Sequence, residues 1–398
     1  MSDFFFHPVF KDAMADIAKL GVQVHQHPTA GAKPYAVVGG RSNARWWLIP
    51  LENSGVAASG LALFQPLLAS ARAMKTAASL LSAVGLSRLW SRNTVYITGE
   101  PALPGVFPCS DGLSFAYFTG TDSPHRKVAV QIMDGRGKLK GFAKLTRNPP
   151  VRQLLMREAA TLEQVNELGL QTAHLPKVLF AGDHGDSSLL VTDTLKTPCT
   201  PATTQFTAAH RAFVLELMQK TATTHSISAG DIAQDFRVRF DRIRTHLTKD
   251  WIQRLDAAIT ALETQPTLEL NACLSHGDFT PWNTFMANGR LYVFDWEYSE
   301  QAYPVGHDII HFVLNQPQTR RLPALGKIEA ASASASLPWT GIKHGTVPAL
   351  LIIYLLTQSL RQIERLPGDK IQGRQWDSAE DIAAIFDELL TDHTAKRA

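Results

Sequence analysis

A change from strand periodicity to helical periodicity near residue 195 constrains the fold of this chain more than any other feature. Between Gly112 and Leu195, apolar residues alternate in SFAYFTGT, KVAVQI and GFAKLT, and again in KVLFAG and SLLVTDT, which is the pattern of half-buried strands. Between the third and fourth segments, Pro149 to Leu168 has helical spacing, opens on proline and ends before Gly169. The sequence therefore predicts a five-stranded antiparallel sheet with one helix inserted after its third strand.

Beyond residue 196 the apolar spacing is mainly helical. Helices are expected at Phe206–His225, at Asp235–Leu247 and in a region that ends with the apolar segment Leu350–Leu356. We therefore expect an α+β protein with a small antiparallel-sheet lobe over residues 113–195, a larger helical lobe over residues 196–398, and an extra N-terminal region over residues 1–112.

The N-terminal region has an apolar stretch at Arg45–Pro50 and an Ala- and Leu-rich helical stretch at Ala57–Val84, which Pro66 interrupts. Arg72 and Lys75 lie within the helical stretch. Two interpretations stay open for it. One is a packed helix pair, and the other is a helix that contacts a membrane surface or a partner protein.

Composition excludes several classes of function. The net charge is +3, from 39 basic and 36 acidic residues, and no dense basic block occurs, so we expect no nucleic-acid partner. The start of the chain, MSDFFFHPVFKD, lacks the pattern of a secretory signal, and the longest apolar run, Val347–Leu356, is about half of the roughly 20 residues that span a bilayer. Cys109, Cys199 and Cys273 are odd in number and widely spaced, which predicts a reducing, cytoplasmic location.

A hairpin within the helical lobe contains the residues of greatest chemical interest. HGDFTPWN at positions 276–283 is followed by TFMANGRLYVF and then by Asp295-Trp296-Glu297. Asn288-Gly289 favours a tight turn because both residues tolerate positive φ. If the strands fold back about this pair, Asn283 and Asp295 are brought together at the open end of the hairpin.

These residue types suit phosphoryl transfer. The amide oxygen of Asn283 and the carboxylate of Asp295 are hard ligands of the kind that Mg²⁺ prefers, with the remaining positions left to water and phosphate. Asp278 precedes Asn283 in an irregular loop, where a carboxylate can orient a substrate hydroxyl and accept its proton.

The sheet lobe supplies a second, independent pattern. Lys144 lies near the end of the third predicted strand, and Glu158 falls within the apolar stripe of the helix that follows, whereas Glu163 does not. A carboxylate on a buried face needs a cationic partner, and the nearest available cation from the adjoining strand is Lys144. A Lys144–Glu158 pair would hold the lysine against nucleotide phosphates.

Together these motifs resemble the aminoglycoside phosphotransferase and choline kinase group of the protein-kinase-like superfamily. HGDFTPWN is similar to the H-G-D-x4-N catalytic loop of that group, and FDWE at 294–297 is similar to its second metal-binding segment. The resemblance covers roughly residues 112–398 and implies a two-lobed kinase-like fold. It also implies Asp278 as catalytic base, Asn283 and Asp295 as magnesium ligands, and Lys144 with Glu158 as the phosphate-positioning pair.

The resemblance further implies that ATP binds with Mg²⁺. The residues expected to contact the nucleotide, besides Lys144, are Gly120, Thr121 and Ser123 in the first turn and Asp193, Thr194 and Leu195 after the last strand. The first turn, TGTDSPHR, differs from a G-x-G-x-x-G loop, and the first hundred residues match nothing in the family core.

The expected function is thus ATP- and Mg²⁺-dependent transfer of the γ-phosphate to a hydroxyl of a small molecule such as a sugar, an amino alcohol or a glycan precursor. One alternative is a catalytically silent, nucleotide-binding scaffold with the kinase-like fold. A second is a metal-dependent hydrolase, whose ligands would come from His276, Asp278, Asp295, His307 and His311. The hydrolase alternative leaves Lys144 and Glu158 without a role.

Overall fold

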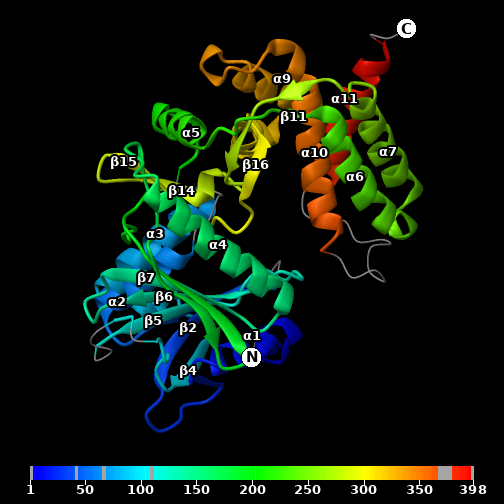
Figure 1. Cartoon of the computed structure of the whole chain (residues 1–398). Helices are drawn as coiled ribbons and strands as arrows, with labels where there is room; N and C mark the ends of the chain where they lie inside the picture. Colours follow the sequence, from blue (N-terminus) through cyan, green and yellow to red (C-terminus); the bar gives the residue numbers. More distant parts are fainter. Residues whose placement is uncertain are drawn as a thin grey trace. The chain divides into compact units, whose positions relative to one another are not determined.

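The computed structural model describes residues 3–40, 44–64, 69–104, 106–107, 112–201, 203–365 and 379–395. The chain separates into two compact units. Unit 1 consists of Met1–Gly169, His174–Ala202 and Phe285–Glu297, and unit 2 of Leu170–Ala173, Thr203–Thr284 and Tyr298–Ala398. Unit 1 is built on a large sheet and unit 2 mainly on helices (Figure 1). The predicted α+β class is confirmed.

In its described residues, unit 1 contains a nine-stranded sheet in the order β1-β4-β2-β3-β5-β6-β7-β10-β9. The strands are β1 Gln23–His25, β2 Lys33–Gly39, β3 Trp46–Pro50, β4 Thr94–Thr98, β5 Ser114–Phe118, β6 Val128–Met133, β7 Leu139–Thr146, β9 Val178–His184 and β10 Ser187–Asp193. The five strands predicted from the sequence are β5, β6, β7, β9 and β10. Strands β1–β4 extend the same sheet, because Trp47 of β3 pairs with Phe118 of β5.

The two faces of this sheet have different coverings. Helix α1, Pro8–Ala18, packs on the face that contains Val130 of β6 and Ala143 of β7. The opposite face of β7, β9 and β10 contacts α4, Pro149–Glu167. Because side chains alternate along a strand, Lys144 and Ala143 of β7 project to opposite faces, and Lys144 lies on the face that α4 covers.

Two helices of the N-terminal region also pack in unit 1. Helix α2, Ser54–Gly60, buries Val56 and Ala57 against β3 and its neighbours, and α3 spans Ala69–Ala83. In α3, Ala78 is buried, whereas Leu80 is 64% exposed. Pro66, the predicted break between them, lies outside the described residues. The helix pair is therefore present, with α2 closely packed and α3 largely exposed to solvent.

The turn between β6 and β7 is held by the Asp134 side chain. The Asp134 carboxylate accepts hydrogen bonds from the backbone N–H groups of Arg136 at 3.0 Å and Lys138 at 2.9 Å. Gly137 has φ +85°, and a Cβ there would lie 2.5 Å from the carbonyl oxygen of Gly55. Glycine is required because α2 approaches this turn so closely.

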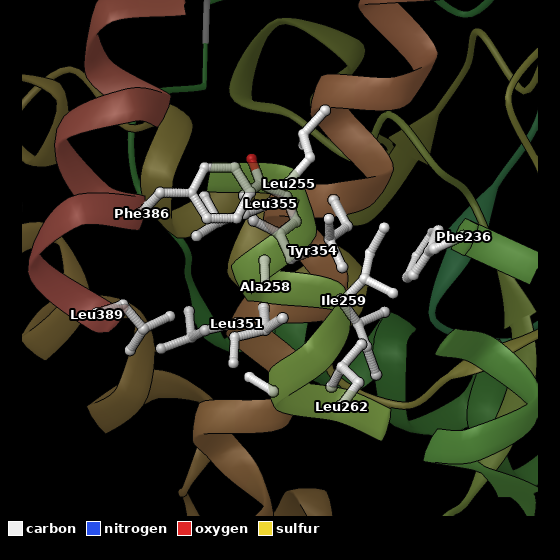
Figure 2. Packing of buried hydrophobic residues seen from close by; sticks show 14 of the residues in the cluster. Phe236, Leu255, Ala258, Ile259, Leu262, Leu351, Tyr354, Leu355, Phe386 and Leu389 are labelled. Atoms are coloured by element: carbon white, nitrogen blue, oxygen red, sulfur yellow. The ribbon is translucent and has the colours of Figure 1, made fainter. Parts of the chain in front are cut away.

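Unit 2 has a helical core. Its described helices are α5 Ala208–Thr221, α6 Ala229–Ile243, α7 Lys249–Glu263, α8 His307–Asn315, α9 Ala324–Ala335, α10 Val347–Ile363 and α11 Ala379–Ala395. Figure 2 shows Phe236 of α6, Ile259 of α7, Leu355 of α10 and Phe386 of α11 in one buried cluster. Helix α10 is apolar on nearly all sides because it lies within this core.

By length and composition, one segment among the described residues could cross a membrane, His344–Ile363, and 78% of its most apolar window is buried inside the protein. The burial of α10 in the cluster of Figure 2 accounts for its composition.

Short strands complete the structure. They are β8 Ala173–His174, β11 Ile227–Ser228, β12 Glu269–Leu270, β13 Ala272–Ser275, β14 Thr284–Ala287, β15 Arg290–Val293 and β16 Glu300–Pro304. Strands β14 and β15 are neighbours and form the predicted hairpin. At its tip, Asn288 has φ 50° and Gly289 has φ 78°, the two positive values that this kind of tight turn requires.

Candidate active site

In unit 1, a buried ion pair connects the sheet to helix α4. The Lys144 ammonium lies 2.6 Å from both carboxylate oxygens of Glu158. Glu158 is 2% exposed and shares its helix face with the buried residues Leu155 and Leu162, whereas Glu163 is exposed. The helix is oriented by its apolar stripe, and this orientation directs the single carboxylate on that stripe toward β7.

Asp295 belongs to the same group. Its Oδ1 lies 2.5 Å from the Lys144 ammonium, although the two residues are 151 positions apart in the chain. Asp295 has φ 71°, a left-handed conformation that is strained for most non-glycine residues and is often retained at functional positions. Burial lowers the pKa of Lys144, but Asp295, Glu158 and Glu297 outweigh burial and raise the pKa above the ordinary lysine value. Lys144 is therefore cationic at neutral pH.

Two residues that the sequence interpretation missed complete this group. Glu297 is 5% exposed and forms a short ion pair with Lys127, which directly precedes β6. Oxygen atoms of Glu158, Asp295 and Glu297 all lie within 4.8 Å of one another. Glu297, the last residue of the FDWE segment, is evident in the sequence, but its burial cannot be inferred from the sequence.

These three carboxylates suit a hard divalent cation. Their donors are all oxygen, as Mg²⁺ prefers, and cationic side chains already balance much of their charge. Among the described residues, these three carboxylates are the group whose spacing could hold a metal ion, and none of its members is a histidine. The histidines His307 and His311, which motivated the hydrolase alternative, are not among its members.

The loop between β5 and β6 is held at several points. Gly120 has φ +83°, and a Cβ there would lie 2.3 Å from the Lys127 carbonyl oxygen, so the two ends of the loop are in close contact. The Ser123 carbonyl accepts a hydrogen bond from the N–H of Arg126 at 3.0 Å. Thr121 is exposed and Ser123 is half-buried.

The segment after β10 carries the other three residues expected to contact the nucleotide. The Asp193 carboxylate accepts a hydrogen bond from the Lys177 N–H at 2.6 Å, which ties the end of β10 to the start of β9. Thr194 Oγ1 accepts a hydrogen bond from the Lys196 N–H at 3.0 Å, and Leu195 is 39% exposed. The Asp193 side chain thus has a structural partner.

In unit 2, Asp278 is bound by two side chains. Asn283 Nδ2 donates to Asp278 Oδ2 at 2.8 Å, and His311 Nε2 lies 3.0 Å from Asp278 Oδ1. His311 Nδ1 is 3.0 Å from the Tyr354 hydroxyl. Because an ionised carboxylate can only accept, Nε2 carries the imidazole proton and Nδ1 accepts from Tyr354. This chain of hydrogen bonds fixes the direction of the Asp278 carboxylate.

The backbone before Asp278 is fixed by Asp308 on α8. Its carboxylate accepts hydrogen bonds from the N–H groups of His276 at 2.7 Å and Gly277 at 3.0 Å. Burial opposes ionisation of Asp308, but hydrogen bonds and the positive charge of nearby histidines hold its pKa well below the usual range. Gly277 has φ +75°, and a Cβ there would lie 1.9 Å from the Tyr298 carbonyl oxygen. Only glycine fits this position.

His276 is buried, and its Nδ1 accepts a hydrogen bond from the Asp278 N–H at 3.2 Å. It therefore supports the loop.

Asn283 and Asp295 flank the β14–β15 hairpin, with Asn283 assigned to unit 2 and Asp295 to unit 1. Each has the contacts given above within its own unit: Asn283 with Asp278, and Asp295 with Lys144. Their joint action on one metal ion remains a prediction.

Comparison with known proteins gives the class. Residues 107–336, more than half of the 398-residue chain, match the model of the phosphotransferase enzyme family abbreviated APH. The chain belongs to this family of phosphotransferase enzymes. No curated protein matches the chain.

Several solved structures are similar to it. Choline kinase LicA from Streptococcus pneumoniae is 15% identical, with a TM-score of 0.46, over 67% of this chain and 89% of that one. A fructosamine-3-kinase from Haemophilus somnus is 12% identical, with a TM-score of 0.44, over 69% and 89%. Aminoglycoside phosphotransferase APH(4)-Ia, in a complex with ADP and hygromycin B, is 14% identical, with a TM-score of 0.42, over 67% and 90%.

Proposed function

We propose that this protein is an ATP- and Mg²⁺-dependent kinase that transfers the γ-phosphate to a hydroxyl group of a small molecule in the cytoplasm. Membership of the phosphotransferase family supports the reaction class. The observation that carries the proposal is the Lys144 ammonium, which contacts both oxygens of Glu158 and also Asp295. A buried lysine oriented by a helix carboxylate is the arrangement that positions nucleotide phosphates in kinases.

The proposed reaction is a direct transfer of the γ-phosphate to the acceptor hydroxyl. The Asp278 carboxylate accepts the proton of the acceptor hydroxyl, the hydroxyl oxygen forms a bond to the γ-phosphorus, and the bond from that phosphorus to the β–γ bridging oxygen breaks as ADP leaves. His311 and Asn283 hold the carboxylate in one direction for this step. Asp295 and Asn283 would bind magnesium, which, when bound, neutralises the charge of the phosphates.

Lys144 has a separate task in this proposal. Its ammonium donates hydrogen bonds to the phosphate oxygens while Glu158 keeps it in place. Gly120, Thr121 and Ser123 are assigned to the phosphates, and the segment Asp193–Leu195 to the base. The acceptor is a sugar, an amino alcohol or a glycan precursor.

The test is a transfer assay with purified protein, Mg²⁺ and radiolabelled ATP against a panel of hydroxyl compounds. The panel includes choline, fructosamine, hygromycin B and streptomycin, because these compounds appear in the names of the similar solved structures. We expect a phosphorylated product from the wild type and a loss of about 10²-fold or more in rate for Asp278→Asn. Asp256→Asn, at a 48% exposed side chain paired with Arg237, is the matched control.

Nucleotide binding without any transfer across the panel would contradict the proposal and favour the catalytically silent alternative. Stoichiometric zinc or iron in the purified protein, with hydrolysis in place of transfer, would favour the hydrolase.

A further inference from the structure

Lys127 lies on the same face of the sheet as Lys144. Ala129 of β6 is the cross-strand partner of Lys144 on β7, and cross-strand partners project to the same face. Lys127 precedes Ala129 by two positions, so its side chain projects to that face too. Diagonal neighbours of this kind are about 7–8 Å apart between their backbones. Two long cationic side chains thus reach the same region of unit 1.

Both lysines contact the acidic group. Lys144 contacts Glu158 and Asp295, and Lys127 contacts Glu297. The Lys127 and Glu297 side chains are 18% and 7% exposed, so this is a largely buried pair. It joins residues that are 170 positions apart. A pair with this much burial and this sequence separation is part of the tertiary structure and differs from the exposed ion pairs of the surface.

The charges in this group do not balance. Three carboxylates face two ammonium groups, which leaves one negative charge in excess when all three are ionised. Burial raises the pKa of Glu158 to about 7, so the full excess is present above neutral pH. A polyphosphate would be repelled by this excess, whereas a divalent cation would be attracted and would reverse its sign. Carboxylates engaged by a metal bind their lysine partners less strongly, and an ammonium released in this way is available to a phosphate oxygen.

The loop that carries Lys127 is held at two points, one of which, Asp16, lies outside the family match. Arg126, the preceding residue, donates to Asp16 of α1 at 2.8 Å, and Asn148 Nδ2 donates to the Pro124 carbonyl at 2.7 Å. The loop has one glycine and one proline between positions 120 and 126, so it offers fewer flexible N–H donors than a glycine-rich loop. The cationic side chain of Lys127, at the fixed end of the loop, can supply the attraction for phosphate that these N–H donors would otherwise provide.

We propose that Lys127 is a second phosphate-binding residue of the nucleotide site, held by Glu297 until a metal-bound nucleotide takes its place. This inference rests on the proposed kinase function. Lys127 acts beside Lys144, and the N-terminal helix α1 positions it through Arg126. The ligand it recognises is the polyphosphate of a nucleoside di- or triphosphate.

The experiment is calorimetric titration of the whole chain with Mg²⁺·ATP, with metal-free ATP and with adenosine. For Lys127→Met, which keeps the apolar stem, we expect Mg²⁺·ATP to bind at least about tenfold more weakly and adenosine to bind within about twofold of wild type. Lys127→Arg should restore most of the affinity. Lys19→Met is the control, because Lys19 also forms an ion pair in unit 1, with Asp186 at 2.6 Å.

Glu297→Gln provides an independent measurement should Lys127→Met fail to fold. Removing this carboxylate frees Lys127 and removes the excess negative charge, so metal-free ATP should bind at least about fivefold more tightly than it does to wild type.

The inference is overturned if Lys127→Met binds Mg²⁺·ATP as wild type does, if it loses adenosine affinity equally, or if Glu297→Gln leaves metal-free ATP unchanged. If one of these results is found and the wild type binds ATP normally, the proposed kinase function stands, but Lys127 has no part in it. If wild type binds no adenine nucleotide at all, both proposals fail.

Discussion

Asp16 on α1 and Arg126 in the β5–β6 loop are 110 residues apart in the chain, and their side chains are joined by a hydrogen bond of 2.8 Å. Asp16 also accepts a hydrogen bond of 2.5 Å from Arg147, which follows β7. A single buried carboxylate from the N-terminal region therefore connects the beginning of β6 to the end of β7. Lys127 and Lys144 lie next to these two anchor points.

Removal of the negative charge of Asp16 should destabilise unit 1. Asp16 has a side chain that is 4% exposed, so Asp16→Asn should lower the free energy of unfolding by about 3 kcal/mol, because two arginines lose their buried partner. Asp12→Asn is the control, since Asp12 contacts the same arginines from a side chain that is 56% exposed. It should cost less than about 1 kcal/mol. Urea denaturation measures both values, and equal costs would contradict a special role for Asp16.

His311 should act on the rate through Asp278. His311→Ala removes the hydrogen bond to Asp278 Oδ1, so we expect kcat to fall about 10- to 100-fold while the KM for ATP changes less than about threefold. Tyr354→Phe leaves the imidazole in place and removes only the hydroxyl at Nδ1, so it should lower kcat by less than about tenfold. A KM effect as large as the kcat effect would instead indicate a structural role.

Gly277 and Gly341 offer a matched test of the catalytic loop. Both have positive φ, +75° and +69°, but a Cβ at Gly277 would lie 1.9 Å from the Tyr298 carbonyl oxygen, whereas at Gly341 nothing lies within 4 Å. Gly341→Ala should cost about 1–2 kcal/mol from backbone strain alone. Gly277→Ala should cost about 3 kcal/mol or more and abolish transfer, because the backbone itself must shift. Thermal unfolding measures the loss of stability, and the transfer assay measures the activity. Similar losses of stability for the two variants would contradict the close packing of Gly277 against the Tyr298 carbonyl.

Mild acid should destabilise unit 2. Burial lowers the pKa of His210 from 6.5 to about 4. Between these pH values the unfolded chain binds a proton that the folded chain does not, so stability falls as the pH drops through this window, by about 3 kcal/mol at most. The Asp308 carboxyl, whose folded pKa lies below 3.8, adds a further loss at lower pH.

His210→Asn tests this pH dependence, because the amide oxygen of asparagine can still accept the hydrogen bond that Thr207 N–H donates to His210 Nδ1. Its free energy of unfolding should vary less between pH 6.5 and about 4 than that of wild type. The exposed residue His225 is the control, and His225→Asn should retain the wild-type dependence. If the free energy of unfolding of His210→Asn still depended steeply on pH, groups other than His210 would be responsible for the dependence.

The parts of the fold that were predicted from the sequence rest on local patterns. Strands β5–β7, helix α4 and the Asn288-Gly289 turn each follow from the spacing of residues close in the chain. The inward direction of Glu158 followed from one helical stripe. The partner of a buried carboxylate could be inferred there because Lys144 is only 14 positions away.

Long-range pairings were beyond such reasoning. The addition of β1–β4 to the sheet depends on pairing between β3 and β5, and the Lys127–Glu297 contact spans 170 positions. The four-residue spacing of His307 and His311 suggests a pair of metal ligands. The structure instead directs His311 to Asp278, 33 positions away. Local periodicity carries no information about such contacts.

The proposed kinase activity is tested most directly by an untargeted mass-spectrometric search for phosphorylated metabolites. A cell extract is incubated with ATP, Mg²⁺ and either the wild type or Asp278→Asn, after both have been found to bind ADP equally. We expect at least one hydroxyl metabolite to gain a phosphate with the wild type and not with the variant. No phosphorylated metabolite with the wild type, or equal phosphorylation with both proteins, would contradict the proposed activity.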